Sequence, residues 1–149
     1  MSKSSPAKSQ AAGCAIIVFM EPSIFTRIIR GEIPSHKVYE DDHTLAFMNI
    51  HPSQPGHVLV VPKKQVAYLY QLEAADYQAL MTTVQKVAKR EAEVFGTDYK
   101  VCLKVMGFDI AHTHVHVLPC KTPADFAATE DMREPNHEAL AAMAAKLKF

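Results

Sequence analysis

The sequence lacks an excess of charge of either sign, because its 16 Lys and Arg residues balance its 16 Asp and Glu residues. Without a net field, neither nucleic acid nor an anionic membrane surface is expected as the main partner, and any preference for anions must be local. Long apolar runs are also missing. The run from Cys14 to Met20 is far shorter than the roughly 20 residues that span a bilayer. We therefore expect no membrane partner.

Cysteine is scarce as well. Cys14, Cys102 and Cys120 are odd in number and widely spaced, which excludes a disulfide framework and a C-x-x-C zinc pair. Such residues are usually small apolar side chains in a reducing compartment. No apolar signal core precedes Cys14. These features predict a cytoplasmic protein.

The chain length of 149 residues fits one compact domain. Residues 1–14 are rich in Ser, Lys, Ala and Gln without apolar periodicity, and we interpret them as a flexible N-terminal tail. Residues 15–149 are then a single domain that ends in a helical extension. We see no internal repeat.

Apolar spacing and turn residues divide this domain into helices and strands. Three helices are predicted: 24–29 after the cap Ser23, 73–95 before Gly96, and a last one after the cap Asn136. Five strands are predicted: 36–40, 44–50, 57–61, 99–105 and 112–118. Most strands are neighbours in sequence, which favours an α+β fold with a five-stranded antiparallel sheet and helices packed on one face.

Three histidines alternate along the last predicted strand. Because side chains alternate across a strand, His112, His114 and His116 should project to one face, each about 6.6 Å from the next. Histidine is the side chain best suited to proton transfer and nucleophilic attack near neutral pH. The alternatives are buried rings with a structural role and solvated surface histidines. Such close rings cannot all be protonated without repulsion, so at least one should stay neutral near pH 7.

The segment 112–118, His-Thr-His-Val-His-Val-Leu, resembles the H-φ-H-φ-H-φ-φ signature of the histidine-triad (HIT) nucleotide hydrolases and transferases. Residues 49–63 are similar to the family's other patterned segment, and residues 24–34 resemble its opening. The resemblance extends from about Ser23 to Cys120. The loop before the triad is short, because it consists of residues 104–111 alone. It lacks the amide side chain that contacts phosphate in many members. This is typical of a shorter-loop branch of the family.

The resemblance implies a nucleotide or nucleoside phosphate substrate and a catalytic role for four histidines. His114 corresponds to the residue that attacks the α-phosphorus and forms a covalent nucleotidyl intermediate, which water then releases. His116 corresponds to the residue that contacts the phosphate and assists the leaving group, while His112 and His57 form supporting hydrogen bonds. The chemistry requires no cofactor and no metal. Family members commonly form homodimers through the long helix and a sheet edge, and the same is expected here.

The resemblance also implies a nucleoside pocket. Asn49 matches the position that takes the ribose hydroxyls, and its amide can both donate and accept hydrogen bonds. The base would lie in an apolar slot made by Phe25, Ile28, Ile33, Phe47 and Ile50. For each apolar residue, ordinary core packing is an equally good interpretation.

Two other functions stay open at this point. The first is a zinc enzyme, because strand-borne His-x-His pairs can bind zinc with His57 or water completing the ligand set. The second is a nucleotide-binding interaction module with little turnover. Metal analysis with activity before and after chelation tests the first, and hydrolysis by a His114 variant tests the second.

Overall fold

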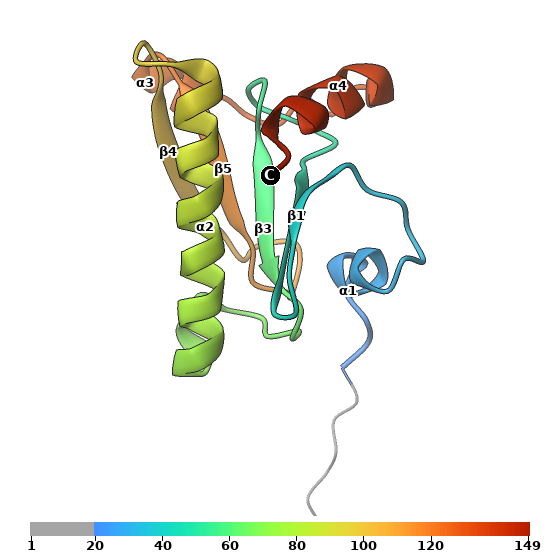
Figure 1. Cartoon of the computed structure of the whole chain (residues 1–149). Coiled ribbons are helices and arrows are strands. Elements are labelled where there is room, and N and C mark those ends of the chain that lie inside the picture. The colour runs from blue at the N-terminus through green and yellow to red at the C-terminus, as the bar shows by residue number, and fades with distance from the viewer. Residues whose placement is uncertain (1–19) are drawn as a thin grey trace, which may run out of the picture.

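The computed structural model describes residues 20–149, so the predicted tail over residues 1–14 lies outside the described part of the chain. Five strands form one antiparallel sheet in the order β1-β2-β3-β5-β4, which confirms the predicted fold class (Figure 1). The strands are β1 (Lys37–Glu40), β2 (Thr44–Met48), β3 (Val58–Pro62), β4 (Lys100–Val105) and β5 (Val115–Cys120).

The long helix α2 (Ala74–Phe95) covers one face of the sheet (Figure 1). Its apolar stripe, which includes Leu80, Val84 and Val87, packs against valines of β3 and β5. Helix α4 (His137–Leu147) begins at the predicted cap Asn136, whose Oδ1 accepts from Ala139 N–H at 3.0 Å, and it joins the same core. The 3.6-residue period in the sequence thus identified both helices and their buried sides.

Helix α1 (Ile24–Ile29) packs on the opposite face of the sheet, so the expectation that helices cover only one face is wrong. Its buried residues Phe25 and Ile28 contact side chains of β2 and β3. Both strands are buried along their whole length, in keeping with their nearly continuous apolar sequences. The face under α1 also carries the histidines.

The predicted bounds differ from the structure by three residues at the last strand. Strand β5 begins at Val115, so His112 and His114 lie in the segment before it and not within it, as the sequence suggested. The partner strand β3 ends at Pro62, and Thr113 N–H instead donates to Val66 O at 2.7 Å. The backbone of residues 112–114 is therefore held by the loop after β3 and cannot extend the ladder.

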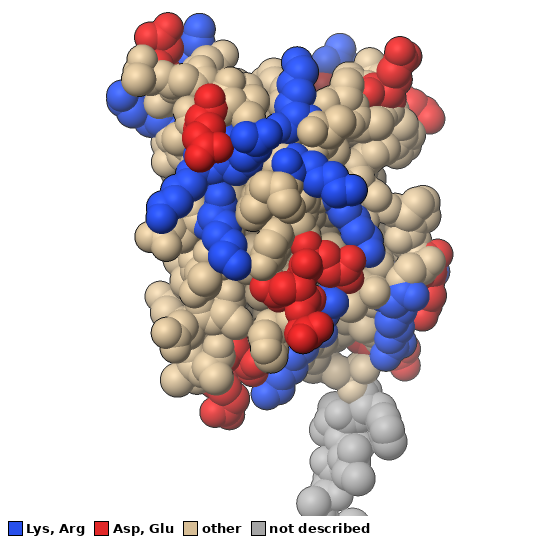
Figure 2. Space-filling view, viewed as in Figure 1, with Lys and Arg blue, Asp and Glu red and all other residues tan. Residues whose placement is uncertain are grey.

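Two short elements were not predicted: the 3-10 helix η1 (Leu69–Gln71) and helix α3 (Pro123–Ala127). Helix α3 starts with a capping box between Thr122 and Asp125, a pattern that is readable in the sequence. Within residues 20–149, no helix is long and apolar enough to cross a membrane. On the face shown in Figure 2, acidic side chains interrupt the basic ones, as the balanced composition suggested.

Candidate functional site

The four histidines predicted from the sequence come together under α1. His57 lies directly before β3, His116 lies within β5 opposite Leu59, and His112 and His114 lie directly before β5. The ring centroids of His57 and His116 are 5.0 Å apart, and those of His114 and His116 are 5.1 Å apart. The rings thus form a cluster that is tighter than the spacing expected for a regular strand.

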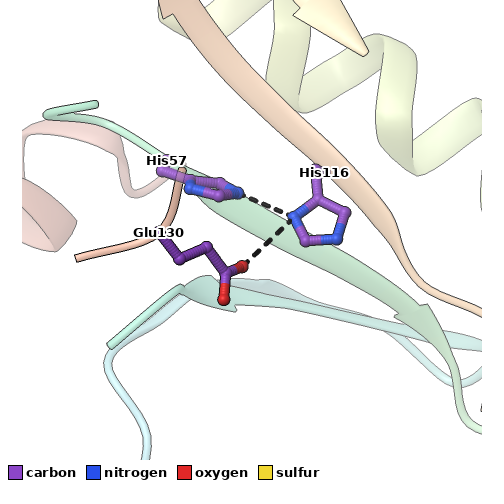
Figure 3. Close-up of side chains that lie close together, drawn as sticks. All are labelled: His57, His116 and Glu130. Carbon is purple, nitrogen blue, oxygen red and sulfur yellow. Dashed lines mark hydrogen bonds and ion pairs between the residues drawn. The ribbon is translucent and has the colours of Figure 1, made fainter. Parts of the chain in front are cut away.

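Hydrogen bonds determine which nitrogen of His57 and His116 carries the proton. Ser53 N–H donates to His57 Nδ1 at 3.1 Å, so the proton of a neutral His57 is on Nε2. That Nε2–H donates to His116 Nδ1 at 2.8 Å (Figure 3). His116 therefore keeps its own proton on Nε2, a buried atom without a partner in the described structure. Nε2–H of His116 is therefore a hydrogen-bond donor that is available to a ligand.

The electrostatics of this pair favour the neutral rings. Burial is the largest cause in both cases, because it penalises the charged imidazolium. Burial, the neighbouring His116 and the charge of Lys104 lower the pKa of His57 to about 3. Burial, His114 and Lys104 lower the pKa of His116 to about 4. Both rings are neutral at pH 7, in agreement with the hydrogen bonds.

His114 presents the opposite nitrogen. Its Nδ1–H donates to the backbone carbonyl of His112 at 2.8 Å, which leaves the Nε2 lone pair of the neutral ring free. The edge of the His114 ring packs against Phe25, with centroids 5.1 Å apart. A free imidazole lone pair beside a free imidazole N–H is a suitable arrangement for attack on an electrophile that carries oxygen atoms.

His112 is fully buried and serves as an anchor. Its Nε2–H donates to Pro62 O at 2.8 Å, so Nδ1 accepts, and Ser23 Oγ lies 2.7 Å from that Nδ1. Burial lowers the pKa of His112 and favours this neutral form. The backbone carbonyl of His112 orients the His114 ring. By holding His112 in place, Ser23 therefore also helps to orient the His114 ring.

A small polar network attaches α1 to this anchor. Thr26 Oγ1–H donates to Gln65 Oε1 at 2.6 Å, and Ser23 N–H donates to the same oxygen at 2.9 Å. Ser23 Oγ also accepts from Thr26 N–H, so the predicted cap of α1 is confirmed. The sequence indicated the cap but not its bond to His112, which joins residues 89 positions apart.

A cavity of about 330 Å³ opens beside His114 and His116. Its size is in the range of small-molecule sites. All six residues predicted to bind the nucleoside line it: Phe25, Ile28, Ile33, Phe47, Asn49 and Ile50. Phe25, Ile28 and Phe47 also belong to the core cluster under α1, so core packing and cavity lining coincide there. His57 and His112 do not line the cavity and stand behind the other two histidines.

Glu130 is a site residue that the sequence did not indicate. It comes from the segment between α3 and α4, and its Oε1 accepts from Asn49 Nδ2 at 2.8 Å. The same oxygen is 4.0 Å from His116 Nδ1 (Figure 3). Asn49 Oδ1 in turn accepts from His51 N–H at 3.0 Å. Glu130 is 81 residues from Asn49 in an irregular segment, and no local pattern could have placed it there.

The loop before the triad also contributes to the cavity. Met106, Phe108 and Ile110 line it, although Phe108 is 91 % exposed. Lys104 lies opposite His116 in the β4–β5 register and supplies a positive charge near the histidines. A larger cavity of about 670 Å³ lies between the loop 52–56 and α4, and none of the four histidines lines it.

Comparisons with known proteins agree with this geometry. The family described as HIT domain matches residues 30–122. The purine nucleoside phosphoramidase of Escherichia coli K12 is 35 % identical over 104 residues, which cover 66 % of this chain and 87 % of that protein. The protein hit of Bacillus subtilis is 33 % identical over 128 residues, which cover 76 % of this chain and 88 % of that protein.

A solved structure shares the fold over most of the chain. It is a Hit-like protein from Bartonella henselae, described as involved in cell-cycle regulation and crystallised with an unknown ligand. The TM-score is 0.76 at 31 % identity, and the match covers 88 % of this chain and 98 % of that one.

Proposed function

The chain belongs to the HIT domain family, and on that basis we propose that it is a nucleotidyl hydrolase or transferase. The proposed substrates are nucleoside phosphoramidates, dinucleoside polyphosphates or related compounds. The relative from Escherichia coli, a purine nucleoside phosphoramidase, supports the first of these classes. The reaction needs no cofactor or metal.

The proposed nucleophile is Nε2 of His114. It attacks the α-phosphorus, so a phosphorus–nitrogen bond forms while the bond to the leaving group breaks. The leaving group departs with the bonding electron pair and takes a proton from solvent. Water then attacks the phosphorus and loses a proton to solvent, the bonding electron pair returns to Nε2 of His114, and a nucleoside monophosphate is released. During the intermediate the ring is cationic, and its Nδ1–H bond to the His112 carbonyl stabilises that charge.

His116 would supply the donor for a phosphoryl oxygen or the leaving atom. Its Nε2–H has no partner in the described structure, and the residue is only 3 % exposed. An unsatisfied buried donor is costly unless a ligand completes it. This orphaned donor beside the free lone pair of His114 is the observation that carries the proposal. His57 and His112 would hold the two reacting rings in the required tautomers.

A hydrolysis panel tests the proposal. Adenosine and guanosine phosphoramidates and dinucleoside polyphosphates are incubated with the native protein and with His114→Asn. We expect nucleoside monophosphate release by the native protein, and a loss of about 10³-fold or more in the variant, as for removal of other nucleophiles. Equal turnover by both proteins would reject His114 as nucleophile.

The same panel addresses the alternative of an interaction module. Such a module would bind nucleoside monophosphate while the native protein shows no turnover on any member of the panel. The geometry favours the enzyme, because His114 presents a free Nε2 lone pair for attack and His116 presents an N–H donor beside it.

The zinc alternative is disfavoured by the donor directions. His57 Nε2, His116 Nδ1 and a Glu130 oxygen lie within 4.8 Å of one another. However, Ser53 N–H donates to His57 Nδ1, which forces the proton onto the nitrogen that would have to bind the metal. Chelation should leave activity unchanged, and loss of activity that zinc restores would contradict this interpretation.

We also propose that two copies pair through β4 and the outer side of α2. Among the described residues β4 pairs only with β5, so its other edge is open. Three apolar side chains are exposed at or beside this edge: Leu103, Val105 and Met106. An exposed apolar edge strand favours aggregation unless another strand covers it. Light scattering should give the mass of a dimer, and Leu103→Lys should give a monomer; a native monomer would refute the proposal.

A cytoplasmic location is the last part of the proposal. Its support is that Cys102 and Cys120 are free thiols.

A further inference from the structure

Part of the cavity beside His114 and His116 is lined by apolar side chains that are exposed to solvent. Phe108 is 91 % exposed, the largest fraction among the large apolar side chains that the structure describes. Ile24 and Met106 line the same cavity and are exposed as well. Exposed apolar side chains that gather at one concave surface are typical of a binding site, because a ligand removes them from water.

These side chains are distinct from the buried apolar slot of the same cavity. Phe25, Ile28 and Phe47 belong to the core cluster under α1 and are at most 8 % exposed, whereas Phe108 is not part of that cluster. A base that fills the buried slot leaves the exposed side chains uncovered. The leaving group has to depart into solvent on the side of the phosphorus away from the attacking nitrogen, so it lies in the exposed part of the cavity.

The loop that carries Phe108 is anchored at its far end. Ile110, two residues further along, packs against the core cluster under α1. The backbone of Thr113 is fixed by the bond from its N–H to Val66 O at 2.7 Å. Phe108 is therefore held close to the segment that carries the reacting histidines, and it offers a pre-positioned aromatic surface at the cavity.

The charged side chains that line the cavity are both acidic. They are Asp109 and Glu130, and no lysine or arginine is among the lining residues. Lys104 lies opposite His116 in the β4–β5 register, but its Nζ is 4.6 Å from the centroid of the Phe126 ring, and the residue does not line the cavity. A leaving group with several phosphates would meet repulsion from the two carboxylates without a cation to offset it. A neutral or cationic leaving group would meet no such repulsion.

We propose that Phe108, together with Ile24 and Met106, binds the leaving group of the substrate, and that this group is an amine that carries an aromatic ring. The inference rests on the proposed function, because it assumes attack by His114 on a nucleoside phosphoramidate. The phosphorus–nitrogen bond of the substrate breaks, and the amine nitrogen keeps the electron pair and takes a proton from solvent. The ring of the amine packs against Phe108, since aromatic pairs gain from stacked or edge-to-face contact.

Equilibrium binding to proteins that carry His114→Asn tests this subsite without turnover. The N-benzyl and N-methyl phosphoramidates of adenosine 5′-monophosphate and diadenosine tetraphosphate are titrated separately. The proteins are His114→Asn alone and His114→Asn combined with Phe108→Ser, Phe108→Leu or Tyr70→Ser. Tyr70 is the matched control, because it is 82 % exposed and does not line the cavity. The benzyl compound should bind about tenfold or more tightly than the methyl compound, as expected for partial burial of one ring.

Adding Phe108→Ser should reduce this preference to about twofold or less. Phe108→Leu keeps an apolar side chain and should retain part of the preference, and Tyr70→Ser should retain all of it. Equal binding of the benzyl and methyl compounds would overturn the inference, and so would a preference that Phe108→Ser leaves unchanged. Tightest binding of diadenosine tetraphosphate, with the largest loss in Phe108→Ser, would assign the subsite to a second base and overturn the amine.

Two further measurements separate this inference from the other proposals. If the benzyl preference depends on Phe108 but the native protein releases no adenosine monophosphate, the proposed enzyme activity fails and the subsite stands. If the native protein hydrolyses both phosphoramidates with equal kcat/KM and binding is equal too, the activity stands and the subsite fails. Light scattering that shows Phe108→Ser to be a monomer, with the benzyl preference unchanged, would assign Phe108 to a contact between copies instead.

Discussion

Glu91 is a carboxylic acid buried in α2 without a partner, and its replacement by glutamine should stabilise the protein at neutral pH. The residue is fully buried, and neither carboxyl oxygen has a hydrogen-bond partner in the described structure. Burial raises the pKa of Glu91 from 4.5 to about 9, because the interior penalises the charged form. The folded protein therefore keeps a proton at pH 7 that the unfolded chain has lost.

The sign and size of the effect follow from proton linkage. Since the folded pKa is raised, the contribution of Glu91 to stability is fully present below pH 4.5 and is lost as the pH rises toward 9. Each pH unit in this window costs about 1.4 kcal/mol, so the loss at pH 7 is about 3 kcal/mol. Glutamine fills the same volume and has no proton to lose.

Urea unfolding of the native protein and Glu91→Gln at pH 5.5, 7 and 8 measures this difference. The difference in free energy of unfolding between the variant and the native protein should grow by about 1.4 kcal/mol for each unit by which the pH rises. Glu93→Gln is the control, because the side chain of this neighbour on α2 is 68 % exposed and its one ion pair within residues 20–149 is with Arg90. Its effect should stay within about 0.5 kcal/mol at every pH. Parallel pH dependences of the native protein and Glu91→Gln would refute an unpaired buried acid.

Three further substitutions test the surroundings of the site. Ser23→Ala removes a helix cap and the partner of buried His112 Nδ1, so urea unfolding should show a loss of about 1–3 kcal/mol, and Ser23→Thr should restore most of it. Gly56→Ala places a Cβ 2.6 Å from the Phe95 ring at a φ of +90°, so the melting temperature should fall; an unchanged value would contradict the close approach. The pKa of His116 in the folded protein is lowered to about 4, so this residue should reduce the free energy of unfolding by about 1.4 kcal/mol for each pH unit as the pH falls from 6.5 to 4. Urea unfolding of His116→Asn should lack this part of the decline. An equal pH dependence of the native protein and the variant would argue against a buried neutral ring.

The sequence was most informative where one physical period governs a long segment. The helix 74–95 and the strands around Thr44–Met48 and Val58–Pro62 were predicted because their apolar spacing reflects one or two buried faces. The prediction for the triad strand was less accurate, because the backbone partner of Thr113 is Val66, in a loop that no pattern of residues 112–118 describes. The alternation of side chains near His116 was right even though the start of the strand was not, because Val115 and Val117 pack in the core with α2 while His116 lies opposite Leu59 on the other face.

The candidate site shows the same division. The cavity residues Phe25, Phe47 and Asn49 came from a resemblance to a family, and they do line one cavity. The contacts of Ser23 with His112 and of Glu130 with Asn49 were not predicted, because each joins residues more than 80 positions apart in the sequence. Contacts of this kind depend on where the chain returns in space, and single side chains carry no period that would reveal them.

The central claim is that Nε2 of His114 forms the covalent bond to phosphorus, and trapping that bond tests it most directly. The protein is mixed with an adenosine phosphoramidate in a single turnover, quenched in base, digested and analysed by mass spectrometry. The account predicts one adenylyl group on the peptide that contains His114, and none in the His114→Asn variant. An adenylyl group on any other residue, or product release by His114→Asn at the native rate, would contradict it.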